Sequence, residues 1–238
     1  GRGAGAKGSF DSMFQGMAVR ETPRPAEFVN ILLHELMHLK SYGALMIKEP
    51  DRTVVPYRGG LTVTTRNELA HYFSSLNEAV TEELAKRIFL NADEPKLQHI
   101  IQVTREFIAA HPDAARDDGS PLFNEDTYDV EIVERSRNGL RLETNCFAYA
   151  KERQALRQLV DKLYSHNADV FPDREAVFVV FARASLTGNL LPLGRLIERT
   201  FSKGTFRKIA ECNDGAKFKN LVDSLPGQEA AAPLSRAA

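Results

Sequence analysis

The sequence predicts an α+β fold that is mainly α, and three observations support this prediction. Apolar residues recur at helical spacing in two segments, near residues 25–43 and 75–89. Between them, residues 44–65 carry short β-prone runs, which predict a small antiparallel hairpin or sheet. From Pro95 onward the pattern is again mainly helical, so we expect a C-terminal helical bundle.

The ends of the chain differ in composition from its middle. Residues 1–20 are rich in glycine and small residues without a sustained period, so we expect a flexible arm. Residues 21–92 are assigned to a core that holds both helices and the hairpin. Residues 93–226 form a mainly helical part of the same domain or a second subdomain, and residues 227–238 a flexible tail.

The first helix is expected to begin at Pro25, because proline suits the first helical position and Glu27 is favourable in the first turn. Gly43 is a natural C-terminal cap. The apolar stripe of a core helix is formed by Phe28, Ile31, Leu32, Leu36 and Leu39.

Three β-prone runs follow, at Ala44–Ile47, Thr53–Val55 and Leu61–Thr64. Pro56 has no N–H for a ladder, which predicts that its strand lies at a sheet edge. An edge strand could hold an extended peptide by adding it to the sheet. A hairpin that only covers the first helix explains the pattern equally well.

The second helix is expected to start near Ser75 or Asn77 and to end near Phe89. Glu78 and Glu82 lie one turn apart beside an apolar row, so at least one of these carboxylates faces inward. Residues 114–120 read as a charged loop, and residues 128–133 as a short strand that could join the hairpin. Further helices are expected at Lys96–Ala110, Thr144–His166, Asp173–Leu186, Leu190–Phe201, Thr205–Cys212 and Lys217–Leu225, with Gly188 and Gly204 at helix ends.

Composition excludes some classes of protein. The formal net charge of −1 does not favour a nucleic acid or an anionic membrane as the main partner. Cys146 and Cys212 lack metal or redox spacing and are read as buried thiols. The apolar runs are too short for a membrane span, so we expect a soluble protein and favour the cytoplasm. The chain does not begin with methionine, and we expect that it can be a piece of a longer protein whose targeting segment is lost.

The motif that organises the chain is His34-Glu35-Leu36-Met37-His38, an H-E-x-x-H run on the first helix. Histidines four residues apart share one helix face, so both imidazoles can reach one metal ion. Glu35 then points toward a water held at the open position of the metal, where it can act as a base.

The third ligand has several candidates. A glycine at position 41 and a histidine at position 44 would complete a longer histidine motif, but Ser41 and Ala44 stand there. His71 and Glu68 have suitable side chains but lie in a short polar stretch. Glu78 is our choice, since it lies on the second helix. Its competing role is a capping box, in which Glu78 bonds back to the backbone of Ser75.

These residues resemble the gluzincin group of zinc metallopeptidases, over about residues 25–90. In that group a glutamate from a second helix completes the metal shell, as Glu78 would in Asn77-Glu78-Ala79-Val80-Thr81-Glu82. The resemblance implies a zincin-like helix pair, a Zn²⁺ cofactor, and a role for Glu82 in orienting His34. Glu82 stands where aspartate is more usual. The run Gly188-Asn189-Leu190-Leu191 is similar to uncharacterised bacterial proteins with this helix pair, which implies no function.

The resemblance implies hydrolysis of peptide bonds in a peptide or protein substrate. Zinc would lower the pKa of its water to roughly 7, and Glu35 would take the proton and return it to the leaving nitrogen. A donor to the oxyanion is expected from Tyr149, Tyr128 or His111. Tyr149 is the one we select, although its phase with Leu156 on the predicted helix also fits core packing.

Two other classes of function stay open. The first is a non-catalytic zinc-bound module that contacts another protein through its helical second half. The second is nucleic-acid binding by a basic C-terminal face, which a solvated surface explains equally well, so no nucleic-acid partner is expected. That face carries Arg195, Arg199, Lys203, Arg207 and Lys208. Neither the substrate nor the oligomeric state follows from the sequence.

Overall fold

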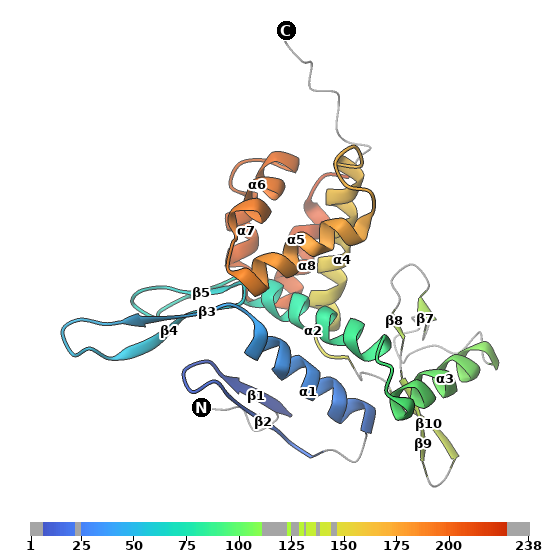
Figure 1. Cartoon of the computed structure of the whole chain (residues 1–238). Coiled ribbons are helices and arrows are strands. Elements are labelled where there is room, and N and C mark those ends of the chain that lie inside the picture. Colours follow the sequence, from blue (N-terminus) through green and yellow to red (C-terminus); the bar gives the residue numbers. More distant parts are fainter. Residues whose placement is uncertain are drawn as a thin grey trace. The chain divides into compact units, whose positions relative to one another are not determined.

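The structure is a computed structural model, which describes residues 7–21, 25–110, 123–124, 129–130, 132–136, 139–143 and 147–227. Within these residues the structure is mainly helical, with eight helices and a small antiparallel sheet. The predicted α+β, mainly α fold class is therefore confirmed (Figure 1). The predicted charged loop, Cys146 and the C-terminal tail lie outside the described residues.

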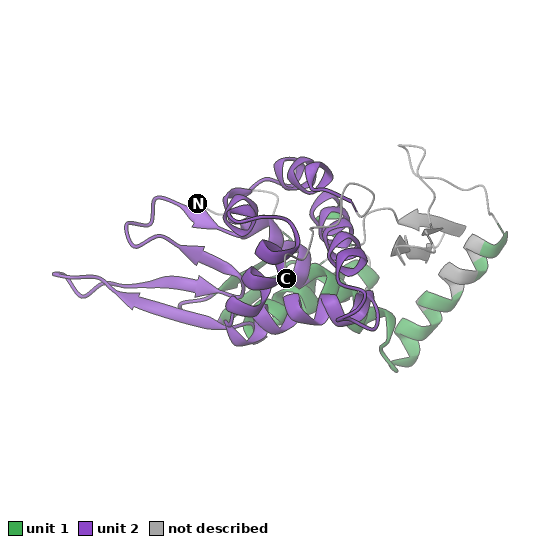
Figure 2. Ribbon diagram, turned by 90° about the horizontal axis from the view of Figure 1, so that it is seen from above, with its two compact units in different colours: residues 1–11, 16–39, 82–150 green, residues 12–15, 40–81, 151–238 purple. Residues whose placement is uncertain are grey.

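The chain divides into two compact units (Figure 2). Unit 1 comprises residues 1–11, 16–39 and 82–150, and unit 2 comprises residues 12–15, 40–81 and 151–238. This division differs from the expected boundary near residue 92, because helix α2 (Ser74–Leu90) contributes its first half to unit 2 and its second half to unit 1. Sequence periodicity cannot detect such a boundary, since the helix itself is continuous.

Unit 1 contains helix α1 (Pro25–Lys40), the second half of α2, and helix α3 (Pro95–Ala110). Its apolar core is small and draws on all three helices. Phe89 packs edge-on against Phe147, with ring centroids 5.8 Å apart. The buried members of this core are Ala26, Phe89, Leu97, Ile101 and Phe147.

The N-terminal segment, for which composition predicts a flexible arm, contains two short strands. Strands β1 (Gly8–Asp11) and β2 (Gly16–Val19) form an antiparallel hairpin. The bond from the Arg20 N–H to the Lys7 carbonyl, at 2.7 Å, extends this pairing. The strands have only four residues each and few β-branched side chains, so the local sequence signal is weak.

Unit 2 contains the predicted small sheet, with strand order β3-β4-β5-β6. The strands are β3 (Gly43–Ile47), β4 (Val54–Gly59), β5 (Thr62–Thr64) and β6 (His71–Tyr72). The prediction that Pro56 marks an edge strand is wrong, because β4 lies between β3 and β5. Pro56 is tolerated there because β5 pairs only with Arg58 and Gly59, and the β3 pairing shifts register next to it.

Gly43 is not the cap of the first helix either. Helix α1 ends at Lys40, and Gly43 is the first residue of β3. The linking residue Tyr42 donates its N–H to the Ser185 carbonyl at 2.9 Å and accepts from the Gly60 N–H at 2.7 Å. These long-range bonds fix the end of α1.

The rest of unit 2 is a helical bundle, as predicted, with helices α4 (Ala150–His166), α5 (Arg174–Thr187), α6 (Leu191–Thr200), α7 (Thr205–Glu211) and α8 (Gly215–Ser224). Gly188 ends α5 with φ 73° and Gly204 precedes α7 with φ 91°, as expected for glycines at helix ends. A side chain on Gly188 would also meet the Tyr42 ring at 2.6 Å.

The short strand expected at residues 128–133 does not join this sheet. Strand β8 (Asp129–Val130) pairs with β7 (Phe123–Asn124), and β9 (Ile132–Ser136) pairs with β10 (Gly139–Glu143). The alternating residues of this segment therefore belong to two separate antiparallel pairs, β7–β8 and β9–β10.

Candidate metal centre

The two motif histidines lie one turn apart on α1 and face each other. Their Nε2 atoms are 3.0 Å apart, and their rings meet edge to face with centroids at 4.7 Å. Two nitrogens that bind one tetrahedral zinc ion stand about 3.3 Å apart, given Zn–N distances of about 2.0–2.1 Å. The imidazoles therefore already stand close to the spacing that a shared metal requires.

Glu82 fixes the orientation of the first histidine. Its Oε2 lies 2.6 Å from His34 Nδ1, and the Glu82 side chain is fully buried. Because a carboxylate accepts, Nδ1 of His34 carries the proton, and the lone pair of the neutral ring is then on Nε2, the atom that faces His38. A histidine held by a carboxylate in this way is the usual arrangement of a metal ligand.

The other oxygen of Glu82 is held just as firmly. Oε1 accepts from Asn30 Nδ2 and from the Ala148 N–H, each at 2.8 Å. Asn30 lies one turn before His34 on α1, and both are buried. The carboxylate thus accepts three hydrogen bonds in the protein interior, which offsets much of the cost of burying it.

Glu78 lies one turn before Glu82 on α2, so helix geometry puts both carboxylates on one face. One ligand atom from each of His34, His38 and Glu78 lies within 4.8 Å of the other two. The competing capping box is not formed, because Ser75 lies inside α2 rather than at the non-helical position before it.

The donor set fits zinc by its chemistry. Two imidazoles and one carboxylate are the ligands of catalytic zinc sites that keep a fourth position open. The protonated Nδ1 of His34 and its carboxylate partner supply the support that such ligands require. His34, His38 and Glu78 are therefore the residues that would hold the ion.

Glu35 is buried next to the two motif histidines, with 7% of its surface exposed. The backbone of Gly8 in β1 reaches its carboxylate, since a Cβ on Gly8 would lie 2.5 Å from Glu35 Oε1 and 2.7 Å from Ile31 Cγ2. Phe10, two residues along the same strand, stacks on His38 with ring centroids 6.2 Å apart and an interplanar angle of 11°. Strand β1 therefore covers the helix face that carries the motif.

Tyr149 is not part of a helix or of an apolar core, contrary to the packing role that its phase suggested. Helix α4 begins at Ala150, and Tyr149 precedes it with φ 55°. Its ring stacks on His34, with centroids 5.5 Å apart and an interplanar angle of 19°, and is 40% exposed. The Ala148 bond to Glu82 and the buried Phe147 anchor the preceding residues. Tyr128 and His111, the other candidate donors, lie outside the described residues.

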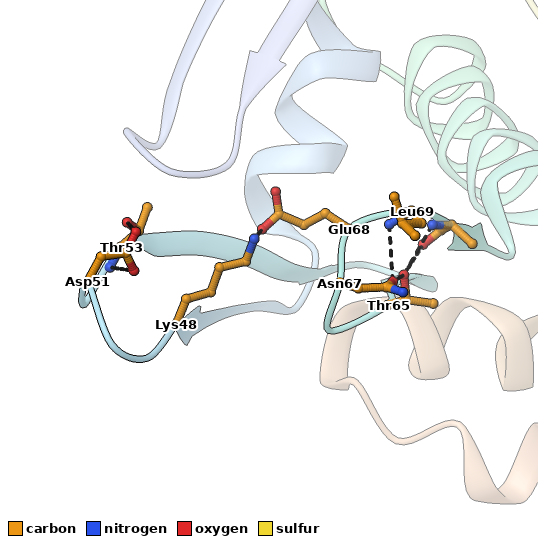
Figure 3. A network of polar contacts seen from close by, with 8 residues as sticks. Lys48, Asp51, Thr53, Thr65, Asn67, Glu68 and Leu69 are labelled. Carbon is orange, nitrogen blue, oxygen red and sulfur yellow. Dashed lines mark hydrogen bonds and ion pairs between the residues drawn. The ribbon is translucent and has the colours of Figure 1, made fainter.

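The alternative third ligands are held in unit 2 by other partners. Nδ1 of His71 lies 3.1 Å from Thr64 Oγ1, across the β5–β6 ladder. Glu68 forms an ion pair with Lys48 (Figure 3). Figure 3 also shows the Asp51 turn, where hydrogen bonds from the Thr53 side chain and backbone lower the pKa of Asp51. This polar network stabilises the loops of the sheet.

The five basic residues of the predicted C-terminal face are exposed, as on a solvated surface; they are Arg195, Arg199, Lys203, Arg207 and Lys208. Arg207 Nε donates to Glu211 Oε1 at 2.9 Å, and Arg199 Nε donates to the Arg195 carbonyl at 3.3 Å.

In the part of the chain that the structure describes, no helix is both long and apolar enough to cross a membrane.

Sequence reasoning missed three residues of this region, namely Asn30, Gly8 and Phe10. Asn30 was detectable in principle, because it lies four residues before His34 and therefore on the same helix face. Gly8 and Phe10 gave no such signal, since their contacts with α1 cross a gap in sequence that no local period covers.

Comparisons of the chain with protein-family models, with curated proteins and with solved structures find no match. The functional argument therefore rests on the geometry of α1 and α2.

Proposed function

We propose that the protein is a zinc-dependent metallopeptidase. The observation that carries the proposal is that ligand atoms of His34 and His38 on α1 and of Glu78 on α2 lie within 4.8 Å of one another, and that α1 also carries Glu35. The carboxylate of Glu82 on His34 Nδ1 supports it further, because a histidine that only fills a core needs no such buried charge. A zincin-like helix pair is the corresponding fold assignment.

The reaction would be general acid–base hydrolysis of a peptide bond. Zinc, when bound, supplies an open position for water and lowers the pKa of that water to about 7. Glu35 accepts a proton from the attacking water, whose oxygen adds to the carbonyl carbon. As the C–N bond breaks, Glu35 returns the proton to the leaving nitrogen, and a carboxylate and an amine result.

Tyr149 is the residue that we propose as the donor to the carbonyl oxygen. Its place beside the His34 ring and its exposed fraction of 40% support this role, because the hydroxyl belongs to a side chain that solvent and substrate can reach. One such donor contributes on the order of 10² to 10³ in rate. Glu82 and Asn30 hold His34 in place and do not contact substrate.

The test combines metal content with activity on unfolded protein substrates. Zinc should bind in a one-to-one ratio, and His38→Ala should abolish tight binding. Glu35→Gln should retain zinc but lose about 10² to 10⁴-fold in activity, since it removes the general base. Glu211→Gln, the same substitution at an exposed carboxylate in α7, should match wild type. Zinc binding with equally negligible activity in wild type and Glu35→Gln would instead support the non-catalytic zinc module.

A further inference from the structure

The N-terminal hairpin lies beside α1 (Figure 1), and its first strand contacts Glu35 and His38 of the motif. Three residues of its first segment make successive contacts along that helix. Lys7 Nζ forms an ion pair with Glu27, the Gly8 backbone approaches Ile31 and Glu35, and Phe10 stacks on His38. The contacted helix positions, 27, 31, 35 and 38, follow the spacing of a single face. All of these contacts lie within unit 1.

The strand geometry explains why these residues make the contacts. Side chains alternate along a strand, so Gly8 and Phe10 point to one side of β1, while Ser9 and Asp11 point to the other. Residue 8 must be glycine in this arrangement, because a Cβ would lie 2.5 Å from Glu35 Oε1 and 3.1 Å from Glu35 Cδ. Backbone thus occupies the space directly beside the carboxylate.

A peptide substrate needs that same space. General-base catalysis requires Glu35 to be within hydrogen-bond reach of the attacking water and the scissile bond. In the structure Glu35 is 7% exposed, and an extended strand of the chain itself lies against it. We propose that the β1–β2 hairpin is an autoinhibitory cover, which must move away before a substrate reaches Glu35 and His38. This inference rests on the proposed peptidase function.

The hairpin is suited to move. Two strands of four residues do not form a stable unit alone, so its position depends on its contacts with α1. Those contacts include an ion pair, a ring stack and the close approach at Gly8. An opening that is populated at a few per cent or less would leave the full chain with weak apparent affinity for any ligand of the metal.

The chain offers a matched pair of variants for the test. A Cβ on Gly8 collides with Glu35, whereas a Cβ on Gly16, in the partner strand of the same hairpin, has nothing within 4 Å. Gly8→Val and Gly16→Val both add a β-favouring side chain, but only the first should displace β1. Phe10→Ala removes the stack on His38 and leaves Gly8, the residue that contacts Glu35, unchanged, so it is a second, independent way to release the hairpin from α1.

The probe is a simple peptide hydroxamate, titrated into the zinc-loaded full chain. Gly8→Val and Phe10→Ala should bind it about 10-fold or more tightly than wild type, as expected when a minor open state becomes the major one. Gly16→Val should match wild type. Hydrogen exchange of the amides in residues 8–19, measured in zinc-free protein, should accelerate in the two release variants only, and cleavage of unfolded substrates should rise with hydroxamate affinity.

Equal hydroxamate affinity in wild type, Gly8→Val and Phe10→Ala would contradict the proposal that the hairpin covers the site, even if all three proteins cleave substrate. An equal gain in Gly16→Val would overturn the assignment to the contact at Glu35. A third outcome is tighter hydroxamate binding and faster exchange in Gly8→Val and Phe10→Ala, with no cleavage by any variant. This outcome would support the autoinhibitory role of the hairpin and contradict the peptidase function. The two proposals can therefore fail separately.

Discussion

In the α4–α8 bundle the fully buried side chains are almost all apolar, whereas in α1 and α2 many of them are polar or charged. The described part of the bundle buries Leu159, Phe181 and Phe218 completely, and its buried polar residues are Arg153, Ser185 and Thr205. The two helices at the candidate metal centre instead bury ten polar or charged residues. These residues are Glu27, Asn30, His34, Glu35, Ser75, Asn77, Thr81, Glu82, Glu83 and Lys86.

The difference between the two regions indicates that the bundle contributes mainly to stability, whereas α1 and α2 bury groups that suit a chemical role. Apolar burial contributes roughly 25 cal/mol per Å², while burying a charge costs free energy even when the charge is well paired. A helix pair selected only for stability would carry leucines where Glu82 and His34 stand. Burying these polar side chains is therefore costly for the fold, and three of them, Asn30, His34 and Glu82, form the hydrogen-bonded network beside the candidate metal centre.

The largest effect on stability is expected in the bundle. Phe181 of α5 is fully buried, and Phe181→Ala should lower the free energy of unfolding by about 3–5 kcal/mol, through lost transfer energy and the cavity that remains. Zinc affinity of the folded protein should not change. Leu186→Ala on the same helix, where leucine is 43% exposed, should stay within about 0.5 kcal/mol of wild type.

Chemical denaturation of the zinc-free proteins measures both variants, and a chromophoric chelator in competition measures zinc affinity. A loss of zinc affinity in folded Phe181→Ala, comparable to that of a ligand variant, would contradict the separation between the two regions.

The reverse pattern is expected for Glu82→Gln. Zinc affinity should fall by about 10–100-fold, because the partner of His34 Nδ1 is lost or misoriented. The amide also cannot accept from His34, Asn30 and Ala148 together, so the zinc-free protein should lose about 1–3 kcal/mol of stability. Competition with a chelator, followed by denaturation of the same sample without metal, separates these two effects.

Glu83→Gln provides the control for this experiment. Glu83 is buried on the same helix but pairs with Arg87 at 3.1 Å and with Lys86 at 3.4 Å. Its loss should destabilise the protein while zinc affinity stays near that of wild type. If Glu83→Gln weakened zinc binding as much as Glu82→Gln, the contact with His34 would not be the cause.

Local periodicity predicted the parts of the site that lie on helices. The 3.6-residue stripe gave α1 and α2 to within a few residues, and the same spacing relates His34 to His38 and Glu78 to Glu82. These residues can be read from the sequence because each relation spans a single turn. The contact between Glu82 and His34 was expected from a resemblance and is present in the structure.

Three of the failed predictions depend on contacts between distant segments. Tyr149 is in helical phase with α4, but α4 starts one residue later, because Tyr149 has φ 55°, outside the right-handed helical region, next to the Ala148 bond to Glu82. Gly43 follows α1 closely enough to cap it, yet Tyr42 pairs with Ser185 and the chain turns into β3. The β1–β2 hairpin has weak strand propensity and is positioned by its contacts with α1. No window of sequence contains these partners.

The smallest effect is expected at a helix cap of the bundle. Asp173 precedes α5 in an extended conformation and accepts from the Ala176 N–H at 2.8 Å. Asp173→Ala should cost about 1 kcal/mol of stability, and Asp173→Asn, which keeps an oxygen acceptor, much less than that. Denaturation midpoints measure both, and hydroxamate and zinc affinities should equal those of wild type. Because Asp173 is exposed, the alanine variant removes a bond without leaving a cavity, so it tests whether the bundle can be weakened slightly while the α1–α2 pair keeps its metal affinity.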